Sequence, residues 1–189
     1  MTAPPPTPVM KPPPMMTPDM MPKPKNLAED LYTVISEAEM TGIPYDQRWI
    51  RTKARGPVPS SSYGPAQINH TLFKDYTERR PHLFTPKELK FVERFSEHGK
   101  KMLEADEKGK YDDPVWGYGG KGKLSEKDKV MYERVAKKML ADTYKRNKGN
   151  IESFWREWRF GESGKNDPSK KDPRYRQQVL NAWQAAHNN

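Results

Sequence analysis

The sequence predicts a mainly α-helical domain with long loops, preceded by an extended arm. Apolar residues recur at the three- and four-residue spacing of helices from residue 27 almost to the C-terminus. Capping residues and glycines divide this stretch into about six segments. The first 26 residues differ sharply, because prolines crowd them. We therefore divide the chain into an arm, residues 1–26, and one domain, residues 27–189.

The arm holds ten of the 19 prolines and six of the ten methionines. Proline fixes the backbone φ angle and lacks an amide hydrogen, so neither a helix nor a sheet can continue through this segment. The composition predicts an extended, polyproline-like arm. Two interpretations stay open: a disordered tail, or an anchor whose methionines fill pockets in a groove of a larger protein.

The first helix is predicted to begin at Asn26 and to end near Gly42, with Pro44 beyond it. The residues on its apolar face are Leu27, Leu31, Val34, Ile35 and Ala38. Residues 43–62 follow without a clear period and are rich in glycine, proline and serine. This composition indicates a loop that contains a short hairpin.

The helices that follow are predicted from their start signals. A short helix is expected from about Gly64 past Leu72. Thr85 then stands as an N-cap before Pro86 at the first helical position and Glu88 at the third. This pattern predicts a helix that begins sharply at Pro86.

Three further helices are predicted in the C-terminal half of the chain. A glycine-rich loop covers residues 108–123, and the first of the three helices runs from about residue 125 to 147. A short aromatic helix is expected over residues 151–160. The last helix opens at Asp172, which is followed by a proline.

Composition excludes several kinds of site. The chain has no cysteine, which excludes a disulfide scaffold, thiolate zinc sites and a cysteine nucleophile. No apolar run approaches the roughly 20 residues of a membrane span, and the N-terminus has no signal-peptide apolar region. The four histidines show no metal-ligand spacing with carboxylates. We therefore expect neither a metal nor a cofactor.

The net charge of +9, from 34 Lys and Arg against 25 Asp and Glu, favours an anionic partner. Acidic residues are interleaved through most of the predicted helices, so the chain has no uniformly basic face. Nucleic acid is therefore not the favoured partner. Bacterial cell walls are also anionic and fit the same charge.

Two segments carry the strongest functional signal. Residues 35–42 read Ile-Ser-Glu-Ala-Glu-Met-Thr-Gly and place glutamates at the end of an apolar helix. Residues 60–68 read Ser-Ser-Ser-Tyr-Gly-Pro-Ala-Gln-Ile, a serine-rich turn with a Gly-x-x-Gln element. Together they resemble the lysozyme-like superfamily, in particular the goose-type lysozyme and soluble lytic transglycosylase branch. Residues 155–161 look like a weaker match to the closing part of that fold.

In this resemblance Glu39 matches the catalytic glutamate, because Ile35 stands four residues before it, as in the family. The resemblance implies that Glu39 protonates the glycosidic oxygen and later acts as a base. Glu37 lies two positions away, about 200° around the helix, and is expected to face another side. Taken without the resemblance, Glu39 is a solvated residue at a helix end.

A second carboxylate is less clearly indicated. Asp46 lies seven residues after Glu39 in the loop and is the candidate. An inverting hydrolase needs such a group to activate water, whereas a lytic transglycosylase needs none. We expect Asp46 to be a loop or capping residue, which favours the transglycosylase.

The resemblance also assigns substrate-binding roles to the serine-rich turn. Ser62 and Tyr63 are expected to line the cleft, and Gly64 to let the backbone approach the sugar. Gln67 is expected to hydrogen-bond an N-acetyl group or the developing charge, with a turn-stabilising amide as the alternative. Trp158 stands where the family has tyrosine and is expected to contact substrate.

Arg159 stands where the family has asparagine, which is a second departure from the pattern. The resemblance implies an enzyme that cleaves the β-1,4 bond between N-acetylmuramic acid and N-acetylglucosamine. The general appearance is similar to virion-associated peptidoglycan-degrading proteins of tailed phages, located in the tail or inside the virion and acting in the host cell envelope. Its partners would be glycan strands and, through the arm, other virion proteins. The alternative is a structural or adaptor virion protein that keeps the fold with little or no activity.

Overall fold

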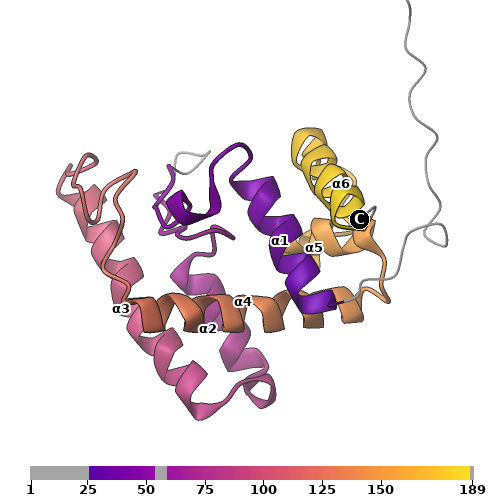
Figure 1. The fold of residues 1–189 in the computed structure, drawn as a ribbon, viewed down its shortest axis with the longest axis horizontal. Helices are drawn as coiled ribbons and strands as arrows, with labels where there is room; N and C mark the ends of the chain where they lie inside the picture. Colours follow the sequence, from indigo (N-terminus) through magenta and orange to yellow (C-terminus); the bar gives the residue numbers. More distant parts are fainter. Residues whose placement is uncertain (1–25, 54–58, 188–189) are drawn as a thin grey trace, which may run out of the picture.

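The computed structural model describes residues 26–53 and 59–187. The predicted arm therefore lies, except for its last residue, outside the described part of the chain. The described residues form a mainly α-helical fold, as predicted (Figure 1). Its α-helices are α1 (Leu27–Glu39), α2 (His70–Arg79), α3 (Pro86–Glu107), α4 (Glu126–Arg146), α5 (Ile151–Gly164) and α6 (Pro173–His187). Two 3-10 turns are η2 (Tyr45–Gln47) and η3 (Pro81–Leu83).

Helix α4 runs across the molecule and connects two groups of helices (Figure 1). Helix α1 packs against α6 and α4, and α5 packs against α4 and α6. At the other end of α4, helices α2 and α3 pack against each other, and α3 also contacts α4. The first and last described helices are therefore neighbours, although the rest of the domain lies between them in sequence.

An aromatic cluster fills the space between α2, α3 and α4. The rings of Phe73 and Phe95 meet edge to face at 5.1 Å, and Phe73 and Tyr132 do so at the same distance. Tyr63 reaches this cluster from the preceding loop and is 0% exposed. Edge-to-face pairs of this kind add about 0.5–1.5 kcal/mol each beyond burial. The cluster therefore holds the serine-rich turn against the helices.

The strongest helix-start signals are confirmed. The Thr85 side chain accepts a hydrogen bond from the Glu88 amide, and the Glu88 carboxylate accepts one from the Thr85 amide at 2.6 Å. Ser125 caps α4 by accepting from the Asp128 amide at 3.2 Å. These caps satisfy amides that have no partner within the first helical turn.

The prediction that a helix begins near Gly64 is wrong. Helix α2 begins at His70, and Asn69 caps it by accepting from the Leu72 amide at 2.7 Å. Residues 64–68 instead form a turn in which the Gln67 amide donates to the Gly64 carbonyl at 3.0 Å. Gly64 has a φ angle of +76°, which a helix does not permit.

The loop after α1 and the end of α5 also differ from the prediction. The described part of the loop contains isolated β-bridges, Arg51 with Tyr63 and Tyr63 with Ile68, in place of a hairpin. Helix α5 was expected to end at Phe160. It continues to Gly164 across a break at Gly161, where φ is +79°.

Arg51 joins the loop to the rest of the domain and is 0% exposed. Its guanidinium pairs with the Asp106 carboxylate, whose side chain is 3% exposed. The same guanidinium donates to the carbonyls of Met102 at 2.9 Å, Trp116 at 2.9 Å and Ser60 at 2.8 Å. One buried side chain thus connects α3, the glycine-rich loop and the serine-rich turn.

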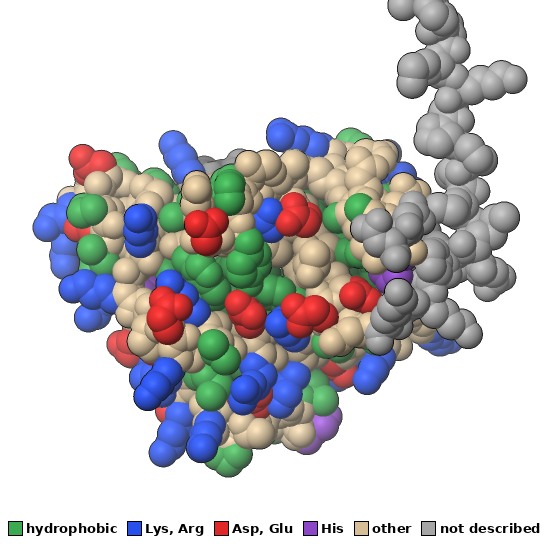
Figure 2. All heavy atoms as spheres, viewed as in Figure 1, with side chains coloured by type: hydrophobic (Ala, Val, Ile, Leu, Met, Phe, Trp, Pro, Cys, Tyr) green, Lys and Arg blue, Asp and Glu red, His purple; other side chains and the backbone are tan. Residues whose placement is uncertain are grey.

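The surface carries both signs of charge. On the face shown in Figure 2, basic and acidic side chains are interspersed around a central hydrophobic area. Within residues 26–53 and 59–187, no helix combines the length and apolar character that a bilayer crossing demands.

Candidate active site

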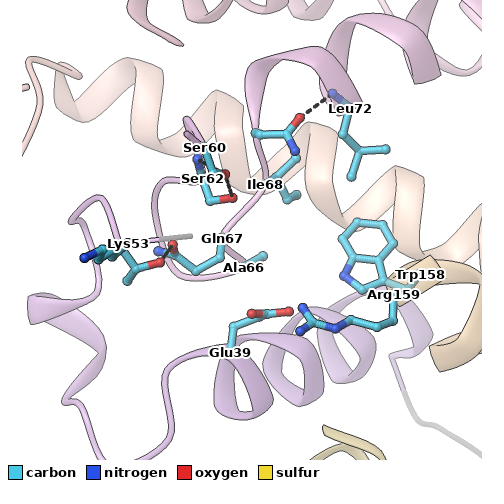
Figure 3. Close-up of a pocket in the computed structure, with 12 residues that line it drawn as sticks. Glu39, Lys53, Ser60, Ser62, Ala66, Gln67, Ile68, Leu72, Trp158 and Arg159 are labelled. Atoms are coloured by element: carbon cyan, nitrogen blue, oxygen red, sulfur yellow. Dashed lines mark hydrogen bonds between the residues drawn. The ribbon is translucent and has the colours of Figure 1, made fainter. Parts of the chain in front are cut away.

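A cavity of about 460 Å³ lies between the end of α1, the serine-rich turn and α5 (Figure 3). Glu39 is the carboxylate among the residues that line it. Two lining residues are cationic, Lys53 and Arg159. The remaining lining residues are Thr52, Ser60, Ser62, Ala66, Gln67, Ile68, Asn69, Leu72 and Trp158.

Glu39 is the last residue of α1 and is partly buried. The helix places it there because Ile35 and Ala38 bury the adjoining face of the same turns. Glu37 is 46% exposed and pairs with Arg48 at 2.7 Å, so it faces away from the cavity. The two glutamates are thus separated as the helical repeat predicts, and Glu39 alone lines the cavity.

Tyr175 of α6 lies beside Glu39 and is fully buried. Burial raises the pKa of Tyr175 well above its usual value, and the Glu39 charge raises it further. The phenol therefore stays protonated and presents a donor to the Glu39 carboxylate. A hydrogen bond between the Tyr175 side chain and the Glu39 carboxylate contributes to the same rise in pKa.

Arg159 and Trp158 form the α5 side of the cavity. The Arg159 guanidinium points toward the Glu39 carboxylate, and the Trp158 ring stands beside it (Figure 3). Asp172 holds this guanidinium through Nε at 3.1 Å and Nη2 at 3.1 Å. The guanidinium also lies over the Tyr175 ring, 4.9 Å from its centre. Arg159 is therefore fixed on two sides while its third side faces Glu39.

The opposite wall is the serine-rich turn. The hydroxyls of Ser60 and Ser62 lie 2.8 Å apart, and both residues line the cavity. Gln67 also lines it, but its side-chain amide donates to the carbonyls of Ile50 at 3.1 Å and Gly64 at 2.8 Å. The Gln67 side-chain oxygen accepts from the Thr52 hydroxyl. In this structure Gln67 braces the turn, which is the alternative role considered for it.

Two residues of the turn lie outside the cavity. Tyr63 is 0% exposed and donates its hydroxyl to the Lys121 carbonyl, so it is a core residue. A Cβ at Gly64 would lie 3.0 Å from the Tyr132 ring. The glycine therefore permits close packing of protein on protein, whereas the sequence predicted close approach to a sugar.

Asp46 is likewise away from the cavity. It lies in η2, is exposed, and does not line the cavity. The structure thus places it as a loop residue. No group of three or more histidines, cysteines, aspartates and glutamates that could hold a metal ion occurs within residues 26–53 and 59–187.

Sequence reasoning missed part of the site. Thr52, Lys53 and Asn69 line the cavity but belong to no recognised motif. Tyr175 lies in the last predicted helix, to which no site role was assigned, and Arg159 was noticed only as a departure from a family pattern. The signal that links these two residues is a contact between helices, which spacing along the chain does not reveal.

Comparison of the chain with protein-family models, curated proteins and solved structures finds no match. The geometry of this cavity and the motifs that surround it are therefore the observations that bear on function.

Proposed function

We propose that this chain is a peptidoglycan-cleaving glycosidase that acts as a lytic transglycosylase, with Glu39 as its acid and base. The observation that carries the proposal is the position of Glu39. Among the described residues it is the one carboxylate lining the cavity, at the end of an apolar helix and opposite a wall of hydroxyls and an amide. This arrangement suits a polar ligand that must be held beside a single acid.

The proposed reaction uses Glu39 twice. Its carboxyl proton goes to the glycosidic oxygen as the bond from that oxygen to the muramic-acid C1 breaks. The resulting carboxylate then takes the proton of the sugar's own 6-hydroxyl as that oxygen attacks C1. The product is a 1,6-anhydro sugar, and the acid is restored without a water molecule.

Within residues 26–53 and 59–187, Glu39 has no second carboxylate beside it in the cavity lining, which supports this outcome over inverting hydrolysis. An inverting enzyme places two carboxyl groups about 6.5–9.5 Å apart so that one can activate water. Asp46, the candidate from the sequence, is exposed outside the cavity. The intramolecular hydroxyl removes the need for such a group.

The cavity also offers fitting contacts for a sugar. The Trp158 ring supplies an apolar face, and Ser60 and Ser62 supply hydroxyls across from it. Sugar rings combine apolar faces with hydroxyl edges, so such a pair of walls matches them. Action on a bacterial cell wall, by a virion protein that docks through its N-terminal arm, remains part of the proposal.

The test is digestion of purified peptidoglycan by the wild type, Glu39→Gln and Glu37→Gln, followed by mass analysis of the soluble products. We expect anhydro-muropeptides from the wild type and a loss of about 100-fold or more in Glu39→Gln. Glu37→Gln is the matched control on the same helix and should retain activity.

Other results would change the assignment. Products with reducing ends would indicate a hydrolase, and Asp46→Asn would be the next variant. Equal activity in Glu39→Gln would contradict the role of Glu39. A folded wild type that digests nothing would favour the structural virion role instead.

A further inference from the structure

The Arg159 guanidinium is held by the Asp172 carboxylate and by the ring of Tyr175. Two of its nitrogens lie 3.1 Å from the Asp172 carboxylate, and its plane lies over the Tyr175 ring. Its side chain is 28% exposed, whereas that of Asp172 is 19% exposed. A guanidinium fixed in this way has a preset direction, and Figure 3 shows that this direction is toward Glu39.

Asp172 connects this guanidinium to the helix that carries Tyr175. One carboxylate oxygen of Asp172 holds Arg159, and the other accepts from the Tyr175 amide at 3.0 Å. Asp172 also precedes the first residue of α6, so it orders the first turn of that helix. A single carboxylate therefore fixes both groups that approach Glu39, the phenol from α6 and the guanidinium from α5.

Helix α6 is also tied to the end of α1. The Gln178 side-chain amide donates to the Thr41 hydroxyl at 3.0 Å, and Thr41 in turn donates to the Glu37 carbonyl at 2.8 Å. Movement of α6 would therefore change the surroundings of Glu39 from two directions.

We propose that Arg159, oriented by Asp172, is a positioning residue that sets the direction of the Glu39 carboxylate toward the cavity. The role of Arg159 in the reaction rests on the proposed function, but its orientation toward Glu39 does not. Arg159 would act through Glu39, so its loss should slow the chemical step more than it weakens glycan binding.

The kinetic test uses Arg159→Met, Arg159→Lys, Asp172→Asn and the exposed control Arg134→Met. In Arg159→Met we expect kcat on soluble glycan strands to fall about tenfold to 100-fold, with KM changed less than about threefold. Arg159→Lys should recover only part of kcat, because an ammonium cannot make two directed contacts with Asp172 and also face Glu39. Asp172→Asn should lower kcat as well, and Arg134→Met should match the wild type.

A second measurement keeps the inference independent of turnover. The side-chain carboxyl carbon of Glu39 can be followed by NMR in protein labelled at glutamate, with Glu39→Gln used to identify its signal. At one fixed pH, Arg159→Met should shift that signal and Arg134→Met should leave it in place. An unmoved signal in a folded Arg159→Met protein would overturn the inference.

Failure of the proposed function can be distinguished from failure of the positioning role of Arg159. If the wild type cleaves no glycan but the Glu39 signal moves in Arg159→Met, the proposed function is wrong and the effect of Arg159 on the Glu39 carboxyl group stands. If the wild type is active and Arg159→Met raises KM with kcat unchanged, Arg159 binds substrate and the positioning role is wrong. Melting curves of every variant establish that the fold is retained.

Discussion

Two arginines of this domain occupy contrasting environments. Arg51 is 0% exposed, and its guanidinium is surrounded by an aspartate and three backbone carbonyls. Arg159 is held by one aspartate on one side and faces a cavity on the other. An arginine whose donors all bond to protein atoms stabilises the fold. An arginine with one side of its guanidinium open to a cavity beside a carboxylate is able to act in a reaction there.

The largest expected effect comes from breaking the buried pair. Arg51→Met should lower the free energy of unfolding by about 3–5 kcal/mol, because it leaves the Asp106 carboxylate and several carbonyls buried without a partner. Urea unfolding would measure the loss. If Arg51→Met does not fold, Asp106→Asn provides the same test, since it removes the charge and keeps the shape. A loss below about 1 kcal/mol in both variants would contradict the structural role.

The next largest effect is a pH dependence of the free energy of unfolding, which is caused by the buried His98. Burial lowers the pKa of His98 to about 4, with Lys101 acting in the same direction and Asp128 opposing it. The unfolded chain therefore binds more protons between about pH 6.5 and pH 4, so stability is complete above that range and decreases as the pH falls through it. The decrease should reach about 3 kcal/mol at most.

The measurement is urea unfolding at pH 7 and at pH 4.5 in the wild type and His98→Gln. The variant should lose less stability on acidification than the wild type does. An equal loss in the two proteins would mean that other groups carry the effect. His82→Gln is a suitable control, because the turn that contains His82 is exposed.

A smaller effect is expected from the amide that braces the serine-rich turn. Gln67→Ala removes the donors to the Ile50 and Gly64 carbonyls and should cost about 1–3 kcal/mol. The exposed Gln47→Ala is the matched control and should change stability by less than about 0.5 kcal/mol. If the turn loosens as expected, thermal unfolding will register it, and glycan digestion should weaken as well because the turn forms one wall of the cavity.

The smallest stability effect is expected at Arg159. Its pair with Asp172 is partly exposed, so Arg159→Met should cost only about 1 kcal/mol in urea unfolding. The two variants should therefore differ in opposite ways. Arg51→Met should show the larger loss of stability, and Arg159→Met should show the larger loss of kcat. Similar stability losses at the two positions would remove the distinction between them.

The sequence predicted the features that depend on neighbouring residues. Thr85 and Ser125 were recognised as helix starts because capping requires only residues within one turn. The separation of Glu37 from Glu39 followed from the helical repeat alone. The start of α2 was predicted several residues too early, near Gly64, although Asn69 was available as a cap.

The features that depend on packing between distant residues could not be predicted from the sequence. An arginine is rarely fully buried, so nothing in the sequence around Arg51 indicated that it lies in the core. Tyr175 and Arg159 approach Glu39 only because α6 packs against α1 and α5. Tyr63 was read as part of a cleft because its turn forms one wall, yet its side chain extends into the core on the other side.

The pairing of α1 with α6 has a consequence for the order of events during synthesis. Glu39 lies on the first described helix and is synthesised long before Asp172 and Tyr175, which lie at the start of the last described helix. A nascent chain therefore carries Glu39 without its neighbours for as long as α6 is missing. Under the proposed function, cleavage would begin only after α6 has packed against α1, so a cleavage assay would also report how much of the protein has completed that packing.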